Sequence, residues 1–195
     1  MKHIVLTCLF FLLCNVVFAE TINNASPGRT NIGVVIVGSS DFKTQDFYEY
    51  LYGQLRTEGN PYSVTVGNDP QNKYMEYWLE QGALEEQVPK KDDLLKFVSF
   101  SRYDKVLYCI VKDPVIEKHS RSAGLFTTTT QTRASITVNA FLCTSDGIIK
   151  TYSVSKQDDS EWSDMRAKMG AIKKCVRDIG KALKPYFSNR TVTKQ

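Results

Sequence analysis

Residues 106–111 read VLYCIV, and this stretch decides the fold. An unbroken run of apolar residues, several of them β-branched, is typical of a strand covered on both faces. A second run of this kind, IGVVIV at 32–37, ends at a Gly-Ser-Ser-Asp turn. The residues between the two runs carry helical spacing, and strands divided by helices indicate an α/β fold.

Three helices are predicted between these runs, with a short strand at 62–66 after the first of them. The first helix has Phe47, Leu51 and Leu55 on one face. The second begins at Asp69-Pro70, where an aspartate cap precedes a proline in the first helical position, and the third covers 89–100. The predicted apolar stripe of the second helix is Tyr74, Met75, Trp78 and Leu79.

After the second run the sequence predicts a polar loop at 117–126 and a long alternating strand at 133–142. Asp146-Gly147 is a strong hairpin signal, so 148–156 is predicted to return antiparallel, in a register that the sequence leaves open. A closing helix follows, with Ser163 or Asp164 as its cap. Its apolar residues recur every three or four positions: Met165, Met169, Ile172, Val176, Ile179, Leu183 and Tyr186.

The predicted order is βαβααβ, then a β-hairpin, then α. This order gives a single α/β domain over 32–187, with a mixed sheet flanked by helices in two or three layers. Before it, 1–19 has the basic start, apolar core and small final residue of a secretory signal peptide, cleaved between Ala19 and Glu20. A membrane anchor needs about 20 apolar residues, more than this run offers.

The segments that flank the domain are predicted to be a flexible leader at 20–31 and a disordered tail at 188–195. The chain is therefore predicted to be exported, to the periplasm or beyond, with no transmembrane span after cleavage. Lipidation at Cys14 is the less favoured alternative, because Leu13 is larger than the residue usual before a lipid-bearing cysteine.

Charge and cysteine content narrow the class of protein. The formal net charge is +4, too mild to indicate a nucleic-acid binder. The exported chain keeps Cys109, Cys143 and Cys175, an odd number that cannot form a complete disulfide framework. Three buried thiols are the favoured interpretation, and a Cys109–Cys143 disulfide is the alternative. Neither a metal site nor a cofactor is predicted.

Two groups of residues are candidate partner-binding sites. Arg166, Lys173, Arg177 and Lys184 form a basic stripe on the closing helix, suited to an acidic partner or an anionic envelope polymer as well as to solvent. Tyrosine is favoured at protein interfaces because it offers flat area and a polar tip. The tyrosines that fit the inward helix faces worst are Tyr50, Tyr52 and Tyr77.

No catalytic residues are predicted. His119 lies beside Ser120, but a Ser–His pair needs an orienting carboxylate and a rigid nucleophile turn, and neither is legible. The Gly-Ser-Ser-Asp turn at 38–41 lies between a strand and a helix, where backbone N–H groups could hold an anion. It lacks the lysine of a P-loop, so a turn with a helix cap is the favoured interpretation.

The element order resembles the α/β envelope domain shared by the TolB N-terminal domain, the curli secretion protein CsgG and the outer-membrane activator LpoB. The residues that carry the resemblance are SRYDKVL at 101–107, VNAFLCTSDGII at 138–149 and GAIKK at 170–174. The chain departs from the pattern in lacking a convincing lipid-bearing cysteine. The resemblance implies a non-catalytic cell-envelope accessory protein that binds a protein partner. The alternatives are an exported hydrolase acting on an envelope polymer and a structural subunit of a homo-oligomer.

Overall fold

One mixed sheet runs through the molecule, in the strand order β1-β3-β2-β4-β6-β5, with β7 paired to β6. The computed structural model describes residues 22–23, 29–57, 59, 62–122 and 128–188. The strands are β1 (Ile22–Asn23), β2 (Thr30–Val37), β3 (Tyr62–Val66), β4 (Lys105–Val111), β5 (Val115–Ser122), β6 (Thr128–Cys143) and β7 (Ile148–Ser160). The helices are α2 (Gln45–Leu55), α3 (Asn68–Glu80), α4 (Lys91–Ser101) and α5 (Asp164–Leu183), with 3-10 turns η1 (Ser40–Phe42) and η2 (Lys184–Tyr186).

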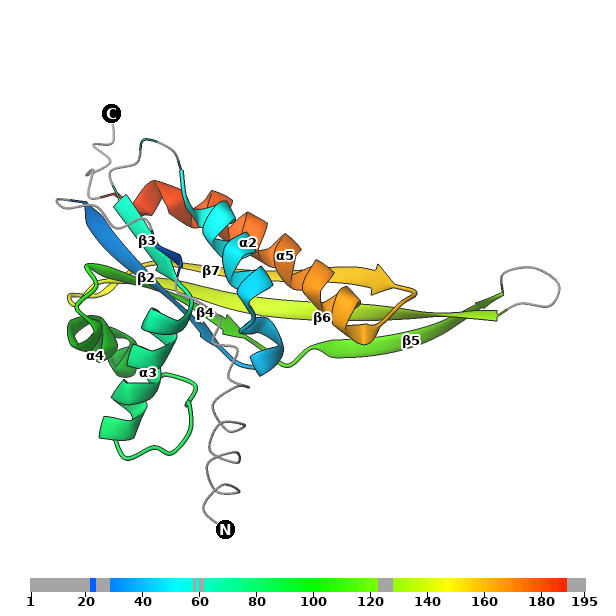
Figure 1. Ribbon diagram of the computed structural model, residues 1–195, viewed down its shortest axis with the longest axis horizontal. Helices are drawn as coiled ribbons and strands as arrows, with labels where there is room; N and C mark the ends of the chain where they lie inside the picture. Colours follow the sequence, from blue (N-terminus) through cyan, green and yellow to red (C-terminus); the bar gives the residue numbers. More distant parts are fainter. Residues whose placement is uncertain (1–21, 24–28, 58, 60–61, 123–127, 189–195) are drawn as a thin grey trace, which may run out of the picture.

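The helices cover both faces of the sheet, so the domain has three layers. Helices α2 and α5 lie on one face, and α3 and α4 lie on the other (Figure 1). Each face has its own apolar core, because neighbouring residues of a strand point to opposite faces. Val34 and Ile36 of β2 pack towards α2 and α5, whereas Val35 and Val37 pack towards α3 and α4. The predicted mixed α/β domain is confirmed.

β6 organises the far half of the sheet. Its C-terminal half pairs with β4 and its N-terminal half with β5, both antiparallel and along the same side. β7 pairs along the opposite side, with Val138 opposite Val154, which sets the register that the sequence left open. The ends of β5 and β6 extend beyond the helices as a two-stranded arm (Figure 1).

Several predicted boundaries differ from the structure; β6 already begins at Thr128, and β7 continues to Ser160. The predicted loop at 117–126 is wrong over 117–122, because β5 pairs with β6 there. This part of β5 was not predicted as a strand, because its residues are polar on both faces and show no alternation of apolar and polar residues. Within the predicted leader at 20–31, Ile22–Asn23 pair with β3, and β2 already begins at Thr30. The predicted Asp69 cap of α3 is wrong, because the helix already begins at Asn68 with Gly67 as its N-cap, and Asp69 lies in the first turn.

The apolar face of α3 is rotated from the predicted one. Tyr77 is only 3% exposed and packs edge-on against Phe97 and Phe100 of α4, so its prediction as a surface residue is wrong. Leu79, predicted to face inward, is 54% exposed. The cause is the position of α4, which lies beside α3 and offers an aromatic surface to that side of the helix.

A buried lysine fastens the end of the domain to the start of β4. Lys105 is 5% exposed, and its Nζ donates to the carbonyl oxygens of Tyr186 at 2.9 Å and Phe187 at 3.0 Å. Burial lowers the pKa of this ammonium from its usual value. The carbonyls carry the negative end of a helical turn, which stabilises the ammonium charge.

The three cysteines of the domain are free and buried, which confirms the favoured interpretation. The alternative Cys109–Cys143 disulfide is wrong. Cys109 lies opposite Ala140, and Cys143 lies opposite Val106, three residues along the ladder. The two thiols also belong to different cores, on opposite faces of the sheet.

These thiols are expected to be unreactive in the folded protein. Burial raises the pKa of Cys109 and Cys143 to about 12 and that of Cys175 to about 11. Almost no thiolate, the reactive form, therefore exists at pH 8. Titration of residues 20–195 with a disulfide reagent at pH 8 should modify none of the three thiols in buffer and all three in guanidinium chloride. Rapid modification in buffer would contradict the burial.

Candidate partner-binding groove

The basic stripe predicted on α5 divides into two parts in the structure. Arg166 and Lys173 line a groove between the N-terminal half of α5 and the η1–α2 segment. Arg177 and Lys184 lie further along α5 and do not line it. The structure therefore brings together half of the predicted stripe. α2 and α5 lie side by side over the same face of the sheet (Figure 1).

The groove is lined by apolar and by charged side chains. Its volume is about 680 Å³. Met165 and Met169 of α5 supply the apolar surface, and Met165 is 42% exposed. Asp41 of η1 and Asp46 of α2 lie on the rim opposite the basic residues; the lining residues are Ser40, Asp41, Thr44, Asp46, Met165, Arg166, Met169 and Lys173. Methionine side chains adapt to differently shaped apolar partners.

Local contacts set the position of the basic groups. Lys173 Nζ lies 5.2 Å from the centroid of the Tyr50 ring, and Tyr50 donates its hydroxyl proton to the Lys173 carbonyl at 3.2 Å. Tyr50 thus positions Lys173 from α2. Tyr52 stacks with Arg56 instead, with the guanidinium carbon 5.7 Å from its ring centroid, and does not line the groove.

Trp162 extends this surface beyond the end of α5, and the sequence analysis missed it. The indole is 81% exposed, and the Arg166 guanidinium lies over it, 5.6 Å from the ring centroid. The Ser163 hydroxyl caps the helix at this end by accepting from the Arg166 N–H at 3.1 Å, which confirms the predicted cap. The sequence did contain a signal for an exposed binding residue here. Trp162 lies between a predicted strand and a helix cap and belongs to no periodic apolar pattern.

The acidic rim is partly neutralised from within the chain. The Lys168 ammonium lies 2.8 Å from Asp41 Oδ2, with both side chains more than two-thirds buried. This ion pair fixes η1 against α5. The remaining charges on the lining are Asp46 on one rim and Arg166 and Lys173 on the other, so the groove has a basic side and an acidic side.

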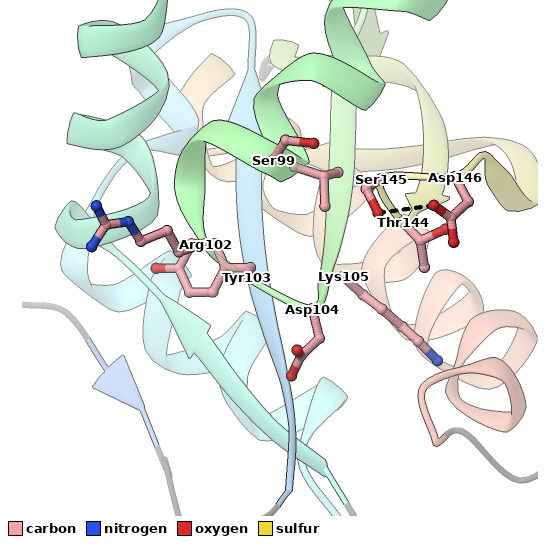
Figure 2. Close-up of a pocket in the computed structure, with 9 residues that line it drawn as sticks. Ser99, Arg102, Tyr103, Asp104, Lys105, Thr144, Ser145 and Asp146 are labelled. Atoms are coloured by element: carbon pink, nitrogen blue, oxygen red, sulfur yellow. Dashed lines mark hydrogen bonds between the residues drawn. The ribbon is translucent and has the colours of Figure 1, made fainter.

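A second depression, shown in Figure 2, holds about 500 Å³ between the end of α4 and the β6–β7 turn. Its charged side chains diverge: Arg102 points away from Lys105, and the amine of Lys105 points towards the C-terminal turn. Asp104 accepts the backbone N–H of Asn31 at 2.7 Å. These groups hold the local backbone and do not converge on a common point.

The turn after β2 binds a carboxylate of the chain itself, that of Glu86. Gly38 donates its N–H to Glu86 Oε1 at 3.3 Å, and Lys43 forms an ion pair with the same carboxylate. The Ser39 hydroxyl accepts from the Asp41 N–H at 3.2 Å and caps η1. The turn and cap interpretation is confirmed, and the place of an external anion is taken by Glu86.

His119 and Ser120 do not face each other as a catalytic pair would. His119 Nε2 lies 3.4 Å from Glu117 Oε2, with both side chains more than half exposed on the β5 arm. Ser120 follows His119 in the strand and so points to the other face. Over the described ranges there is also no group of three or more potential metal ligands, and no helix has the length and apolarity to cross a membrane.

Comparison with known proteins gives structural likeness alone. No family model and no curated protein matches the chain. Similar solved structures include bacterial lipoproteins. GNA1162 from Neisseria meningitidis is 16% identical, with 78% of this chain and 99% of that chain covered and a TM-score of 0.41. The rare lipoprotein B from Shewanella oneidensis is 8% identical, with 80% and 92% covered and a TM-score of 0.29.

A third similar structure is the hypothetical protein CT253 from Chlamydia trachomatis. It is 10% identical, with 82% of this chain and 98% of that chain covered and a TM-score of 0.40. At such TM-scores the likenesses carry no argument about function. The resemblance to the TolB N-terminal domain, CsgG and LpoB stays a prediction from the sequence.

Proposed function

We propose that the chain is an exported, non-catalytic accessory protein of the bacterial cell envelope, and that it binds a protein partner in the groove between α5 and η1–α2. The observation that carries the proposal is the combination of exposed Trp162 and Met165 with Arg166 at one end of α5. Tryptophan and arginine contribute most to binding energy at protein interfaces.

The groove favours a partner segment of mixed character. An apolar side chain would pack on Met165 and Met169, and a carboxylate would face Arg166 and Lys173. Export rests on the signal peptide predicted at 1–19, which lies outside the described residues along with the cleavage site at Ala19 and Glu20. The diverging polar groups elsewhere favour binding over an exported hydrolase.

The test places a photo-crosslinking amino acid at position 165 or 169 in the native envelope, with position 184 as the control. We expect one envelope protein to be crosslinked from 165 and 169 and not from 184, because Lys184 lies outside the groove. Crosslinked products would be identified by mass spectrometry. Equal crosslinking from all three positions would contradict a specific groove.

Substitution then measures the contribution of the groove to affinity for the captured partner. The double variant Trp162→Ala/Arg166→Ala is expected to weaken binding at least about 30-fold, because a hot-spot residue contributes about 2 kcal/mol or more. The matched variant Arg177→Ala/Lys184→Ala removes basic residues outside the groove and should change affinity less than about threefold. An equal loss of affinity in both double variants would indicate that the whole basic stripe binds the partner. If instead no protein partner were captured and the chain bound only to purified cell-wall polymer, the hydrolase alternative would be favoured.

A further inference from the structure

β7 forms a long outer edge of the sheet. It has 13 residues, against about 5–6 in a common strand, and contains neither glycine nor proline. Over the described part of the chain it pairs with β6 alone. Natural edge strands are usually protected by shortness, proline, bulges or covering loops, because an open edge can add a further strand.

The middle of this edge presents unpaired backbone groups. Lys112 donates its N–H to the Thr137 carbonyl at 3.0 Å, so Thr137 directs its backbone towards β4 and β5. The next β6 residue, Val138, therefore faces β7, where it lies opposite Val154. Backbone direction alternates along a strand. The β7 residues whose N–H and C=O face outward are consequently Thr151, Ser153, Ser155 and Gln157.

A side-chain contact supports this assignment. Lys174 Nζ reaches from α5 to the Gln157 carbonyl oxygen at 2.9 Å, which agrees with a carbonyl on the outer side. The same ammonium contacts Asp158 Oδ1 at 2.6 Å. Lys174 thus occupies one end of the edge. The stretch from Thr151 to Ser155 has no comparable cover from the described residues.

The order of charges along β7 matches a reversed copy of the same strand. Lys150 lies near its start, and Asp158 lies near its end. In an antiparallel pair with Val154 on the two-fold axis, Lys150 of each copy lies opposite Asp158 of the other. Both side chains share the α5 side of the sheet, because they are an even number of residues from buried Val154. Oppositely charged residues directly opposite each other stabilise strand pairing.

Other arrangements lose this match. If the two-fold axis moves to Ser153, Lys150 lies opposite Lys156 of the other copy. If it moves to Ser155, Asp158 lies opposite Tyr152. In a parallel pair in register, each lysine of β7 lies beside the same lysine of the other chain. Like charges directly opposite each other are destabilising, so among registers with most of β7 paired the charges favour the one with Val154 on the axis.

We propose that two copies of this chain associate through β7, antiparallel and with Val154 on the two-fold axis, to form one continuous sheet. Two-fold dimers of this kind use the same patch on both subunits. No β7 residue lines the groove between α5 and η1–α2, so both grooves of the dimer stay open. The proposal does not depend on the partner that the groove binds.

Cysteine crosslinking tests the register. Ser153 of one copy lies opposite Ser155 of the other, at the spacing of about 5.5 Å that a disulfide spans. A mixture of Ser153→Cys and Ser155→Cys proteins should form a disulfide-linked heterodimer under mild oxidation. A mixture of Ser153→Cys and Gln157→Cys, which match only in a shifted register, should form much less. Equal yields, or no crosslink, would overturn the proposal.

Sedimentation of the exported protein at up to about 100 µM tests the association itself, since edge contacts of this size are at the weak end of interfaces. The wild type is expected to sediment as a dimer and Ser155→Pro as a folded monomer, because proline removes an outward N–H without breaking a backbone bond to β6. Both Ser155→Pro and Ser155→Ala lose the Ser155 hydroxyl contact with Thr137 of β6, so the comparison isolates the N–H. Ser155→Ala keeps the N–H and should stay dimeric. A monomeric wild type, or a Ser155→Pro dimer, would overturn the proposal.

Discussion

Replacing Gln71 with methionine is expected to lower the free energy of unfolding by about 2–6 kcal/mol, because two buried backbone groups lose their partners and each such loss costs about 1–3 kcal/mol. The side chain is 8% exposed. It accepts the Ile36 N–H at 2.8 Å and donates to the Ile36 carbonyl at 2.9 Å. Urea denaturation followed by circular dichroism measures the change.

The reason lies in the length of β3. It pairs with β2 only as far as Gly33, so the outer backbone of Ile36 has no strand beside it. The Gln71 amide, carried by α3, takes the place of the missing strand. Gln81→Met, at the exposed end of the same helix, is the matched control and should change stability by less than about 0.5 kcal/mol. A similar cost at both positions would show that the amide is not the cause.

Replacing Tyr108 with alanine is expected to cost about 3–5 kcal/mol, the range for removal of a large buried ring. The side chain is fully buried in β4, and its ring centroid lies 6.0 Å from that of Phe97 and 6.2 Å from that of Tyr74. It holds α3 and α4 against the sheet. Its hydroxyl donates to the Leu94 carbonyl at 2.7 Å.

Tyr108→Phe separates the ring from the hydroxyl. It keeps the aromatic packing and removes one hydrogen bond, so a loss of about 1 kcal/mol is expected. Chemical denaturation of both variants gives the comparison. A loss in Tyr108→Ala no larger than that in Tyr108→Phe would mean that the aromatic cluster repacks around the cavity.

The sequence predicted best where burial leaves a periodic trace. The strands at 32–37 and 106–111 are apolar because a core packs against each of their faces, and the stripe of α5 is apolar because one core packs against it. Each was predicted within two residues of its observed bounds at most ends. β5 shows no such periodicity, because the arm packs neither of its faces against a core and its residues are polar on both. The orientation of α3 depends on its packing against α4, and so does the burial of Tyr77. The spacing of apolar residues within α3 carries no information about that neighbour.

The groove illustrates the same limit. Arg166 and Lys173 were predicted as a binding stripe, but Asp41 and Asp46 join them only because η1 and α2 lie against α5 in space. Gln71 was equally invisible, because a lone glutamine in a helix gives no sign that a distant strand lacks a neighbour. Contacts between residues far apart in the chain set both features.

The Lys105 contact also determines when the domain can be completed. Lys105 is made early, while the carbonyls of Tyr186 and Phe187 that hold its ammonium are made among the last residues. Until they arrive, the start of β4 would bury an uncompensated charge, which is strongly unfavourable. The start of β4 and the C-terminal turn are thereby coupled, so a chain shortened before Tyr186 would lack the acceptors that compensate the Lys105 ammonium.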